Sequence, residues 1–105
     1  MGEQRQDTDL EIYRRAAETA TEIDVRFRET TNPEERARLR EERDRAFSAF
    51  VAARVTLLRS GIITTAADLA EMARIQQQID QAADTQLLIQ AIGRFAGFLL
   101  RLAVL

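Results

Sequence analysis

Residues 88–105 read LIQAIGRFAGFLLRLAVL, and this stretch decides the fold because a helix built from it is apolar around most of its circumference. One apolar seam, at steps of three and four residues, consists of Leu88, Ile92, Phe95, Leu99 and Leu102. A second seam beside it consists of Ile89, Gly93, Ala96, Leu100 and Ala103. The remaining narrow polar strip is formed by Gln90, Arg94, Gly97 and Arg101. A helix of this kind has to be buried on more than one side.

Outward from this stretch, the rest of the chain is typical of one helical domain. The 105 residues are rich in Ala, Leu, Arg, Glu and Gln, include four glycines and one proline, and show no alternating, strand-like segment. Such a composition favours helices throughout, and the length suits a single domain. We therefore expect an all-α fold, with residues 1–7 as a disordered tail and residues 8–105 as the domain.

Capping signals mark where the first two helices begin. Thr8 and Glu11 fit a capping box, in which a hydroxyl and a carboxylate satisfy two otherwise unpaired backbone amides. Asn32 is a good N-cap, and Pro33 suits the first position of a helix. The connection between the two helices is short, which makes them antiparallel neighbours.

A second pair of signals separates the second helix from the segment that follows it. Gly61 is expected to adopt the left-handed conformation just beyond the end of the second helix. Thr65 and Asp68 form the next capping-box pair, so a third helix begins there. The predicted fold is an antiparallel bundle of three long helices, over residues 8–30, 33–60 and 65–104.

Whether the last helix is continuous depends on the residues around Asp84. Apolar residues keep a heptad phase from Met72 to Ala103, which favours one unbroken helix. The alternative is a bend near residue 84, where Asp84 would cap a fourth helix. A straight helix would have to be covered by other molecules, whereas a bent one would fold back into a compact four-helix bundle.

The composition excludes several classes of function. The chain has no Cys and no His, so thiolate chemistry, disulfides and the common zinc sites are ruled out. Carboxylates one turn apart, such as Asp80 and Asp84, are expected to face solvent, because dimetal helical bundles pair Glu with His. We therefore expect no catalytic residue, no metal and no cofactor, and a protein that is not an enzyme.

The charge balance argues against nucleic acid as a partner. Fifteen basic and 17 acidic residues give a formal net charge of −2, whereas nucleic-acid binding needs a basic face. The most charged stretch, residues 34–45, reads EERARLREERDR and holds five acids and five arginines. Glu34–Arg38 and Glu41–Arg45 are expected to pair along a solvated helix face.

The apolar stretch predicts assembly with another chain. If the last helix ran back along the second, its most apolar part would face the charged residues 34–45 and stay uncovered. Residues 86–105 are therefore expected to form an assembly segment, covered by other copies of the chain or by another helical protein. The expected interface consists of Leu88, Ile89, Ile92, Gly93, Phe95, Ala96, Leu99, Leu100 and Leu102. Inside each subunit, the helices are expected to pack through Tyr13, Phe27, Phe47, Phe50, Ile75 and Ile79.

These observations predict a non-enzymatic scaffold or adaptor subunit that forms homo-oligomers. The first six residues contain no apolar core of a signal peptide, so a bacterial cytoplasmic location is expected. The alternative function is that of a peripheral membrane protein whose C-terminal helix lies in the bilayer interface. A membrane-spanning role is disfavoured because Arg94 falls in the middle of the span.

Overall fold

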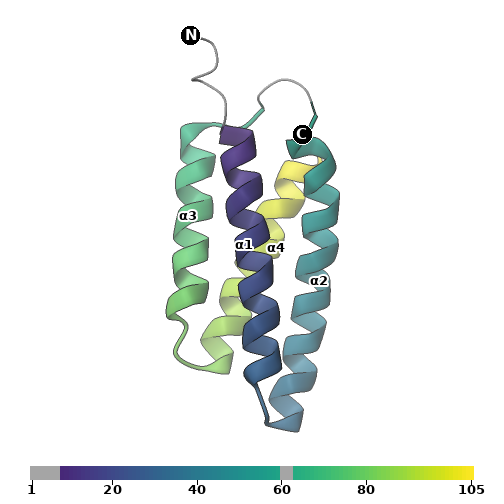
Figure 1. Cartoon of the computed structure of the whole chain (residues 1–105), viewed down its shortest axis with the longest axis vertical. Helices are drawn as coiled ribbons and strands as arrows, with labels where there is room; N and C mark the ends of the chain where they lie inside the picture. The colour runs from purple at the N-terminus through teal and green to yellow at the C-terminus, as the bar shows by residue number, and fades with distance from the viewer. Residues whose placement is uncertain (1–7, 60–62) are drawn as a thin grey trace.

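Four α-helices make up the structure, a computed structural model that describes residues 8–59 and 63–105 (Figure 1). The helices are α1 (Thr8–Glu29), α2 (Pro33–Leu57), α3 (Ala66–Gln81) and α4 (Thr85–Ala103). The predicted all-α bundle is thus confirmed in its four-helix version, with α1 and α2 ending slightly earlier than predicted. The expectations of a disordered tail at residues 1–7 and of a left-handed Gly61 fall outside the described residues.

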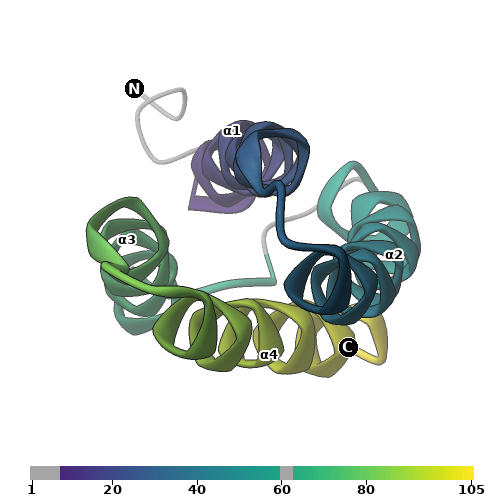
Figure 2. The ribbon, with the colours of Figure 1, turned by 90° about the horizontal axis from the view of Figure 1, so that it is seen from below.

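The four helices surround one core, as the view along the bundle in Figure 2 shows. α1 packs on α2 and α3, and α4 packs on the same two helices from the opposite side. α1 and α3 run in one direction, and α2 and α4 run in the other (Figure 1). α2 and α3 are consecutive helices, but they lie on different sides of the bundle, each between α1 and α4 (Figure 2). The bundle extends over 51 × 22 × 17 Å.

The preferred continuous helix over residues 65–104 is wrong, because the chain breaks between Gln81 and Thr85. Asp84 adopts an extended conformation there, with φ −141° and ψ 172°. Its carboxylate accepts a hydrogen bond of 2.8 Å from the backbone amide of Leu87 and so caps the start of α4. The alternative of a bend near residue 84 is the one that the structure has.

Two arginines bind backbone carbonyl groups at helix ends. Arg26 of α1 donates to the carbonyl oxygens of Ile79 and Ala82, at 2.9 and 2.7 Å, and so satisfies the end of α3. Arg36 of α2 donates to the carbonyl oxygen of Thr30, just after α1, at 3.1 Å. A positive charge at these positions also complements the helix dipole. Both contacts tie the end of one helix to a neighbouring helix.

The break also changes which face of the last helix is buried. The buried residues of α3 are Met72, Ile75 and Ile79, as the heptad phase predicts. A continuous helix would next bury the seam that contains Gly93 and Leu100, but both of these residues are exposed. The seam that α4 buries instead consists of Leu88, Ile92, Phe95, Leu99 and Leu102. The interruption therefore lets α4 turn its more apolar seam toward the core.

The parallel course of α2 and α4 removes the mismatch that the sequence led us to expect. The hydroxyl of Thr56, near the end of α2, donates to the carbonyl oxygen of Ala103, at the end of α4, over 3.2 Å. At the other end, the hydroxyl of Thr85 donates to the carboxylate of Glu35 over 2.8 Å. The last part of α4 thus lies beside the apolar half of α2, and the expectation that it would face residues 34–45 is wrong.

Apolar side chains from all four helices form the core. Its largest fully buried members include Phe95, Phe98, Ile12, Ile23, Leu39, Leu57, Met72 and Leu99. Of the six residues expected to hold the subunit together, three are buried: Phe27, Ile75 and Ile79. Tyr13 and Phe50 are partly buried and stack on each other, with ring centroids 5.7 Å apart. Phe47 is 41% exposed, so its assignment to the core is wrong.

The caps predicted at Asn32 and Thr65 are confirmed, whereas the hydroxyl of Thr8 makes a different contact. Asn32 caps α2 as expected, because its side chain accepts hydrogen bonds from two amides of the first turn, each at 3.0 Å. Thr65 and Asp68 form the predicted capping box at the start of α3. Thr8 instead lies inside α1, and its hydroxyl donates to the carbonyl oxygen of Thr64 over 3.2 Å.

One buried carboxylate fixes the connection before α3 to the start of α1. Asp9 is only 4% exposed, and its oxygens accept hydrogen bonds from the backbone amides of Ile63 and Thr64, at 3.1 and 2.9 Å. The hydroxyl of Thr64 also donates to this carboxylate. A buried carboxylate with several donors is satisfied, so it can hold the loop without a large desolvation penalty.

Candidate functional site

The nine residues expected to form an intermolecular interface lie mostly inside the chain's own core. The six that are buried there are Leu88, Ile92, Phe95, Ala96, Leu99 and Leu102. Ile89 is partly buried, whereas Gly93 is exposed and Leu100 is 49% exposed. The premise that the chain cannot cover its apolar stretch is therefore wrong. Contact of the three accessible residues with another chain stays a prediction.

A different helix presents a row of exposed apolar side chains. These residues follow one another at steps of four, four and three along α2 and its C-cap residue, and we call them the α2 stripe: Phe47, Val51, Val55 and Leu58. Their exposed fractions are 41%, 52%, 64% and 52%, although all four are large and apolar. Sequence reasoning assigned Phe47 to the core and missed the stripe. The signal was present, because residues 46–58 carry apolar side chains on more sides than one core can cover.

A groove between α1 and α2 extends the α2 stripe sideways. Its volume is about 330 Å³. The side chains that line it are Ala17, Ala20, Thr21, Phe47, Phe50 and Val51. The hollow exists because α1 offers only small side chains opposite the two phenylalanines of α2. Its lining is mainly apolar, so it suits an aliphatic or aromatic side chain from another molecule.

Exposed apolar side chains gather toward one end of the bundle. At the end where α2 and α4 finish, the large exposed residues are Leu10, Val55, Leu58, Val104 and Leu105. At the opposite end lie the α1–α2 turn and the charged residues 34–45 (Figure 1). Leu87, 48% exposed at the start of α4, is an exception. The molecule thus has an apolar end and a charged end.

At the charged end, arginines cover an aromatic ring instead of pairing as the sequence led us to expect. The guanidinium carbons of Arg36 and Arg43 lie 4.4 and 4.3 Å from the ring centroid of Phe27. Arg43 also pairs with Asp24 of α1 at 3.3 Å. Within the described residues, neither expected pair, Glu34–Arg38 or Glu41–Arg45, is formed, and Arg45 pairs with Glu42 at 2.8 Å. The stretch therefore closes this end of the core through cation–π contacts.

The exposed side of α1 carries a small network of ion pairs. Glu11 contacts both Arg14 and Arg15, and Arg14 also contacts Glu18 at 2.7 Å. The hydrogen bond from Arg14, together with the charges of both arginines, lowers the pKa of Glu11 below its usual value of 4.5. The same contacts raise the pKa of Arg14. This network is exposed to solvent and indicates no catalytic group.

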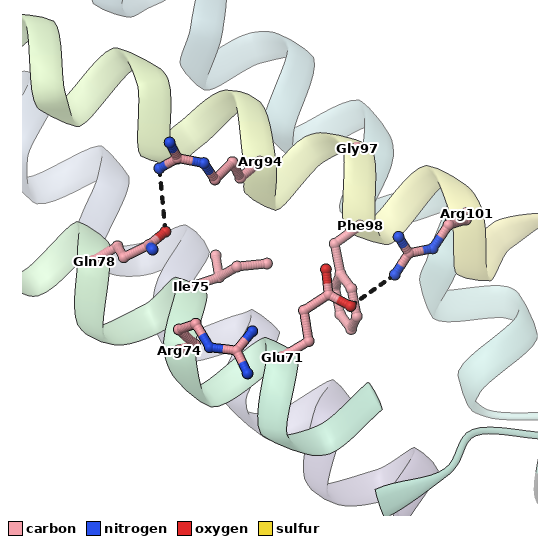
Figure 3. A pocket seen from close by; sticks show the side chains of 8 residues that line it. All are labelled: Glu71, Arg74, Ile75, Gln78, Arg94, Gly97, Phe98 and Arg101. Atoms are coloured by element: carbon pink, nitrogen blue, oxygen red, sulfur yellow. Dashed lines mark hydrogen bonds and ion pairs between the residues drawn. The ribbon is translucent and has the colours of Figure 1, made fainter. Parts of the chain in front are cut away.

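A second hollow, of about 400 Å³, lies between α3 and α4 (Figure 3), and we call it the α3–α4 hollow. α3 contributes Glu71, Arg74, Ile75 and Gln78. α4 contributes Arg94, Gly97, Phe98 and Arg101. Gly97 adds no side chain to this space, and a Cβ added there would meet nothing within 4 Å beyond its own stretch of helix. The polar strip that the sequence shows on the last helix thus lines a cavity.

The arginines of the α3–α4 hollow differ in their partners, since one contacts a carboxylate and another contacts a neutral amide. Arg101 pairs with Glu71 at 2.9 Å, and its guanidinium carbon lies 5.5 Å from the ring centroid of Phe98. Arg94 donates to the neutral side-chain oxygen of Gln78 at 3.3 Å (Figure 3). Buried apolar side chains form the floor, and guanidinium groups form the rim. Such a lining can hold an anion that also has an apolar part.

Metal-binding and membrane-spanning features are limited. Among the residues that the structure describes, no group of three or more carboxylates is placed to hold a metal ion. In the same residues, α4 alone is long and apolar enough to cross a membrane by length and composition. However, much of α4 is buried inside the chain, and the core helix of a globular bundle meets the same criteria.

Comparison of the chain with protein-family models, with curated proteins and with solved structures gives no match. The surfaces of this chain that can bind another molecule are the α2 stripe with its groove and the α3–α4 hollow.

Proposed function

We propose that the protein is a non-enzymatic helical interaction module, a structural or adaptor subunit, that pairs with a second copy of itself through the α2 stripe. One observation carries the proposal: four large apolar side chains, 41–64% exposed, stand in a row on α2. Single exposed apolar residues are normal on protein surfaces, whereas a contiguous row with an apolar groove beside it is typical of a contact surface. The proposal moves the predicted interface from α4 to α2.

The spacing of the α2 stripe favours a second copy as the partner. In an antiparallel pair of α2 helices with a two-fold axis at Val51, Phe47 of one copy opposes Val55 of the other. The same arrangement places Leu58 opposite Asp44, whose carboxylate pairs with Arg43 of its own chain at 3.0 Å. The middle of the stripe is thus complementary to itself through apolar contacts.

The exposed area supports a dimer of modest affinity. Burying the accessible half of each of the four side chains contributes roughly 1 kcal/mol per residue, or about 8 kcal/mol for two copies. Association itself costs an estimated 4–15 kcal/mol. The two terms are of similar size, so at most about 4 kcal/mol remains, and we expect dissociation in the millimolar range. The groove between α1 and α2 can add to the contact by receiving a side chain of the second copy.

The test is the mass of the full chain in solution across a concentration series, measured by sedimentation equilibrium. We expect a monomer–dimer equilibrium, and the substitution Val51→Glu should abolish it because two carboxylates would meet at the two-fold axis. Leu87→Glu is the matched control, since Leu87 is exposed to a similar extent, 48% against 52%, but lies outside the α2 stripe. This control should dimerise like the unmodified chain.

Three outcomes would contradict the proposal. The first is a chain that stays monomeric up to several millimolar. The second is a dimer that persists in Val51→Glu but is lost in Leu100→Glu, which would return the interface to α4. The third is a monomer that binds anionic vesicles through the apolar end of the bundle, as the peripheral membrane alternative requires. Vesicle co-sedimentation of the same variants measures the last outcome.

A further inference from the structure

We propose that the α3–α4 hollow is a binding site for a small organic anion, in which a carboxylate or phosphate group is attached to an apolar body. The hollow lies between α3 and α4, and the α2 stripe lies on another helix of the bundle. Binding there is therefore independent of self-association, and either proposal can fail without the other. Three properties of the hollow suit such an anion: its charge, its guanidinium donors and its apolar floor.

The charge of the hollow is opposite to that of the chain. Arg74 comes from α3, and Arg94 and Arg101 come from α4, whereas Glu71 is the only acidic residue of the lining. Three positive charges and one negative charge leave a surplus of two positive charges. The whole chain has a formal net charge of −2. A local positive surplus in an acidic protein attracts an anion to this place rather than to the surface at large.

Two guanidinium groups of the hollow have donors without an anionic partner. Glu71 neutralises Arg101, at 2.9 Å. Arg94 contacts only a neutral amide oxygen, and within residues 8–59 and 63–105 no carboxylate lies within 4 Å of the guanidinium of Arg74 or Arg94. Figure 3 shows these two arginines on opposite sides of Ile75. Guanidinium groups match the geometry of carboxylates and phosphates, so an anion can complete this pair.

The floor of the hollow selects anions that carry an apolar body. Ile75 and Phe98 are 4% and 2% exposed and close the bottom of the hollow. Gly97 leaves room above them, because no atom lies within 4 Å of the position of a Cβ. The volume of about 400 Å³ lies in the range of small-molecule sites. Inorganic phosphate would reach the arginines but not the floor, whereas an aromatic acid would reach both.

The experiment follows backbone amide shifts of the full-length, isotope-labelled chain at low salt while single probes are added. The probes are benzoate, phenyl phosphate, inorganic phosphate and the neutral benzyl alcohol. We expect saturable shifts around residues 71–78 and 94–101 with at least one aromatic anion, and at least tenfold weaker binding of inorganic phosphate and benzyl alcohol. Whichever aromatic anion binds more tightly identifies the preferred charged group. High salt should weaken the binding.

Variants locate the site. Arg74→Gln and Arg94→Gln should each weaken binding of the aromatic anion about tenfold. Arg38→Gln, on exposed α2 surface, is the control and should leave binding unchanged. Gly97→Leu should fill the hollow and abolish binding, whereas Gly93→Leu adds the same side chain one turn away and should not. Thermal melts check that both leucine variants stay folded.

Any of four results overturns the proposal. The first is that no probe saturates in the millimolar range, and the second is that benzyl alcohol binds as tightly as the aromatic anions. The third is that the two arginine variants bind as well as the unmodified chain, and the fourth is that the saturating shifts lie outside α3 and α4. None of these results depends on whether the chain forms dimers, because Val51→Glu can be titrated in the same way.

Discussion

At the scale of single residues, the most consequential polar group is the carboxylate of Asp9. It is buried beside the connection that leads to α3 and accepts hydrogen bonds from two backbone amides and one hydroxyl. The interaction joins residues 54 and 55 positions apart in the sequence. Backbone amides that lose their acceptor in a buried place remain unsatisfied, and this makes the residue sensitive to substitution.

We expect Asp9→Ala to lower the free energy of unfolding by about 3 kcal/mol, since two amides and a hydroxyl lose their acceptor at once. Urea unfolding followed by circular dichroism measures the change. Asp80→Ala is the control, because Asp80 is an exposed carboxylate of α3, and it should change the free energy by no more than about 0.5 kcal/mol. Equal effects of the two substitutions would show that the buried contacts contribute little.

Substitutions at the two glycines of α4 should raise the free energy of unfolding rather than lower it. Gly93 and Gly97 lie in the interior of the helix, and a Cβ added at either position meets nothing within 4 Å. Gly93→Ala and Gly97→Ala should therefore each raise the free energy of unfolding by about 0.5–1 kcal/mol, because alanine loses less conformational freedom in a helix. A loss of stability on either substitution, in the same urea assay, would mean that another molecule or segment occupies that space.

The carboxyl group of Glu11 should make a contribution to stability that depends on pH. Its pKa is lowered in the folded chain by the hydrogen bond from Arg14, so the stabilisation is complete above about pH 4.5 and is lost as the pH falls through the lower folded value. A carbon-detected NMR titration should place this pKa below 4.5. Arg14→Gln should move it back upward, and an unchanged value in that variant would contradict the assignment.

At the scale of helices, α4 is the element on which the bundle depends. It contacts both α2 and α3, and its buried side includes Phe95, Phe98 and Leu99. Burial of its large apolar side chains contributes on the order of 10 kcal/mol, at 1.5–3 kcal/mol for each. That amount is comparable to the whole stability of a domain of this size.

A chain that stops at Gln86 is therefore expected to be unfolded, with little helical signal in far-ultraviolet circular dichroism. The matched control stops at Ala103 and loses only Val104 and Leu105, which are 82% and 55% exposed. This control should retain the fold. A truncated chain that melted cooperatively without α4 would show that the first three helices form a domain by themselves, with α4 free for assembly.

How far the sequence predicts these helices depends on the kind of signal. The starts at Asn32 and Thr65 were predictable, because a side chain and an amide only a few residues away determine a cap. The break before α4 could be named only as an alternative, since Asp84 is a good cap but also tolerable inside a helix. Arg26 stabilises the broken form by binding the carbonyl groups of Ile79 and Ala82, and it comes from a helix more than 50 residues away, where local patterns give no signal.

The candidate surfaces were harder to predict than the helices. The sequence showed the polar strip that contains Arg94, Gly97 and Arg101, but not that α3 lies opposite and turns the strip into a hollow. It also showed the apolar residues of the second half of α2 without indicating which of them face outward. Both facts depend on the order of helices around the bundle, and hydrophobic periodicity does not specify that order.

At the scale of the whole molecule, the bundle is elongated, and its two ends differ in the polarity of their exposed side chains. It extends over 51 Å, with exposed apolar side chains toward one end and arginines around Phe27 at the other. An amphiphilic body of this kind can associate side by side or end to end. The position of the α2 stripe, which lies along the side of α2, favours the side-by-side arrangement.

Small-angle scattering of the dimer distinguishes these arrangements. An antiparallel pair with its axis at Val51 overlaps over much of its length, so its longest dimension should be about 70 Å. An end-to-end pair joined through the apolar ends would reach about 100 Å, twice the length of one molecule. The monomer, with a Cα radius of gyration of 14.2 Å, provides the reference. A longest dimension near 100 Å would contradict pairing through the α2 stripe.

The parallel pairing of α2 with α4 has a consequence for synthesis on the ribosome. Of the four helices, α2 is made second, but the helix that covers its inner face, with Ala49, Ala53 and Leu57, is made fourth. A nascent chain that carries only α1 and α2 therefore leaves this face of α2 uncovered, and the bundle can close only after translation has passed α4. Folding of this chain is thus expected to be a late event that occurs in one step, rather than a helix-by-helix process that keeps pace with elongation.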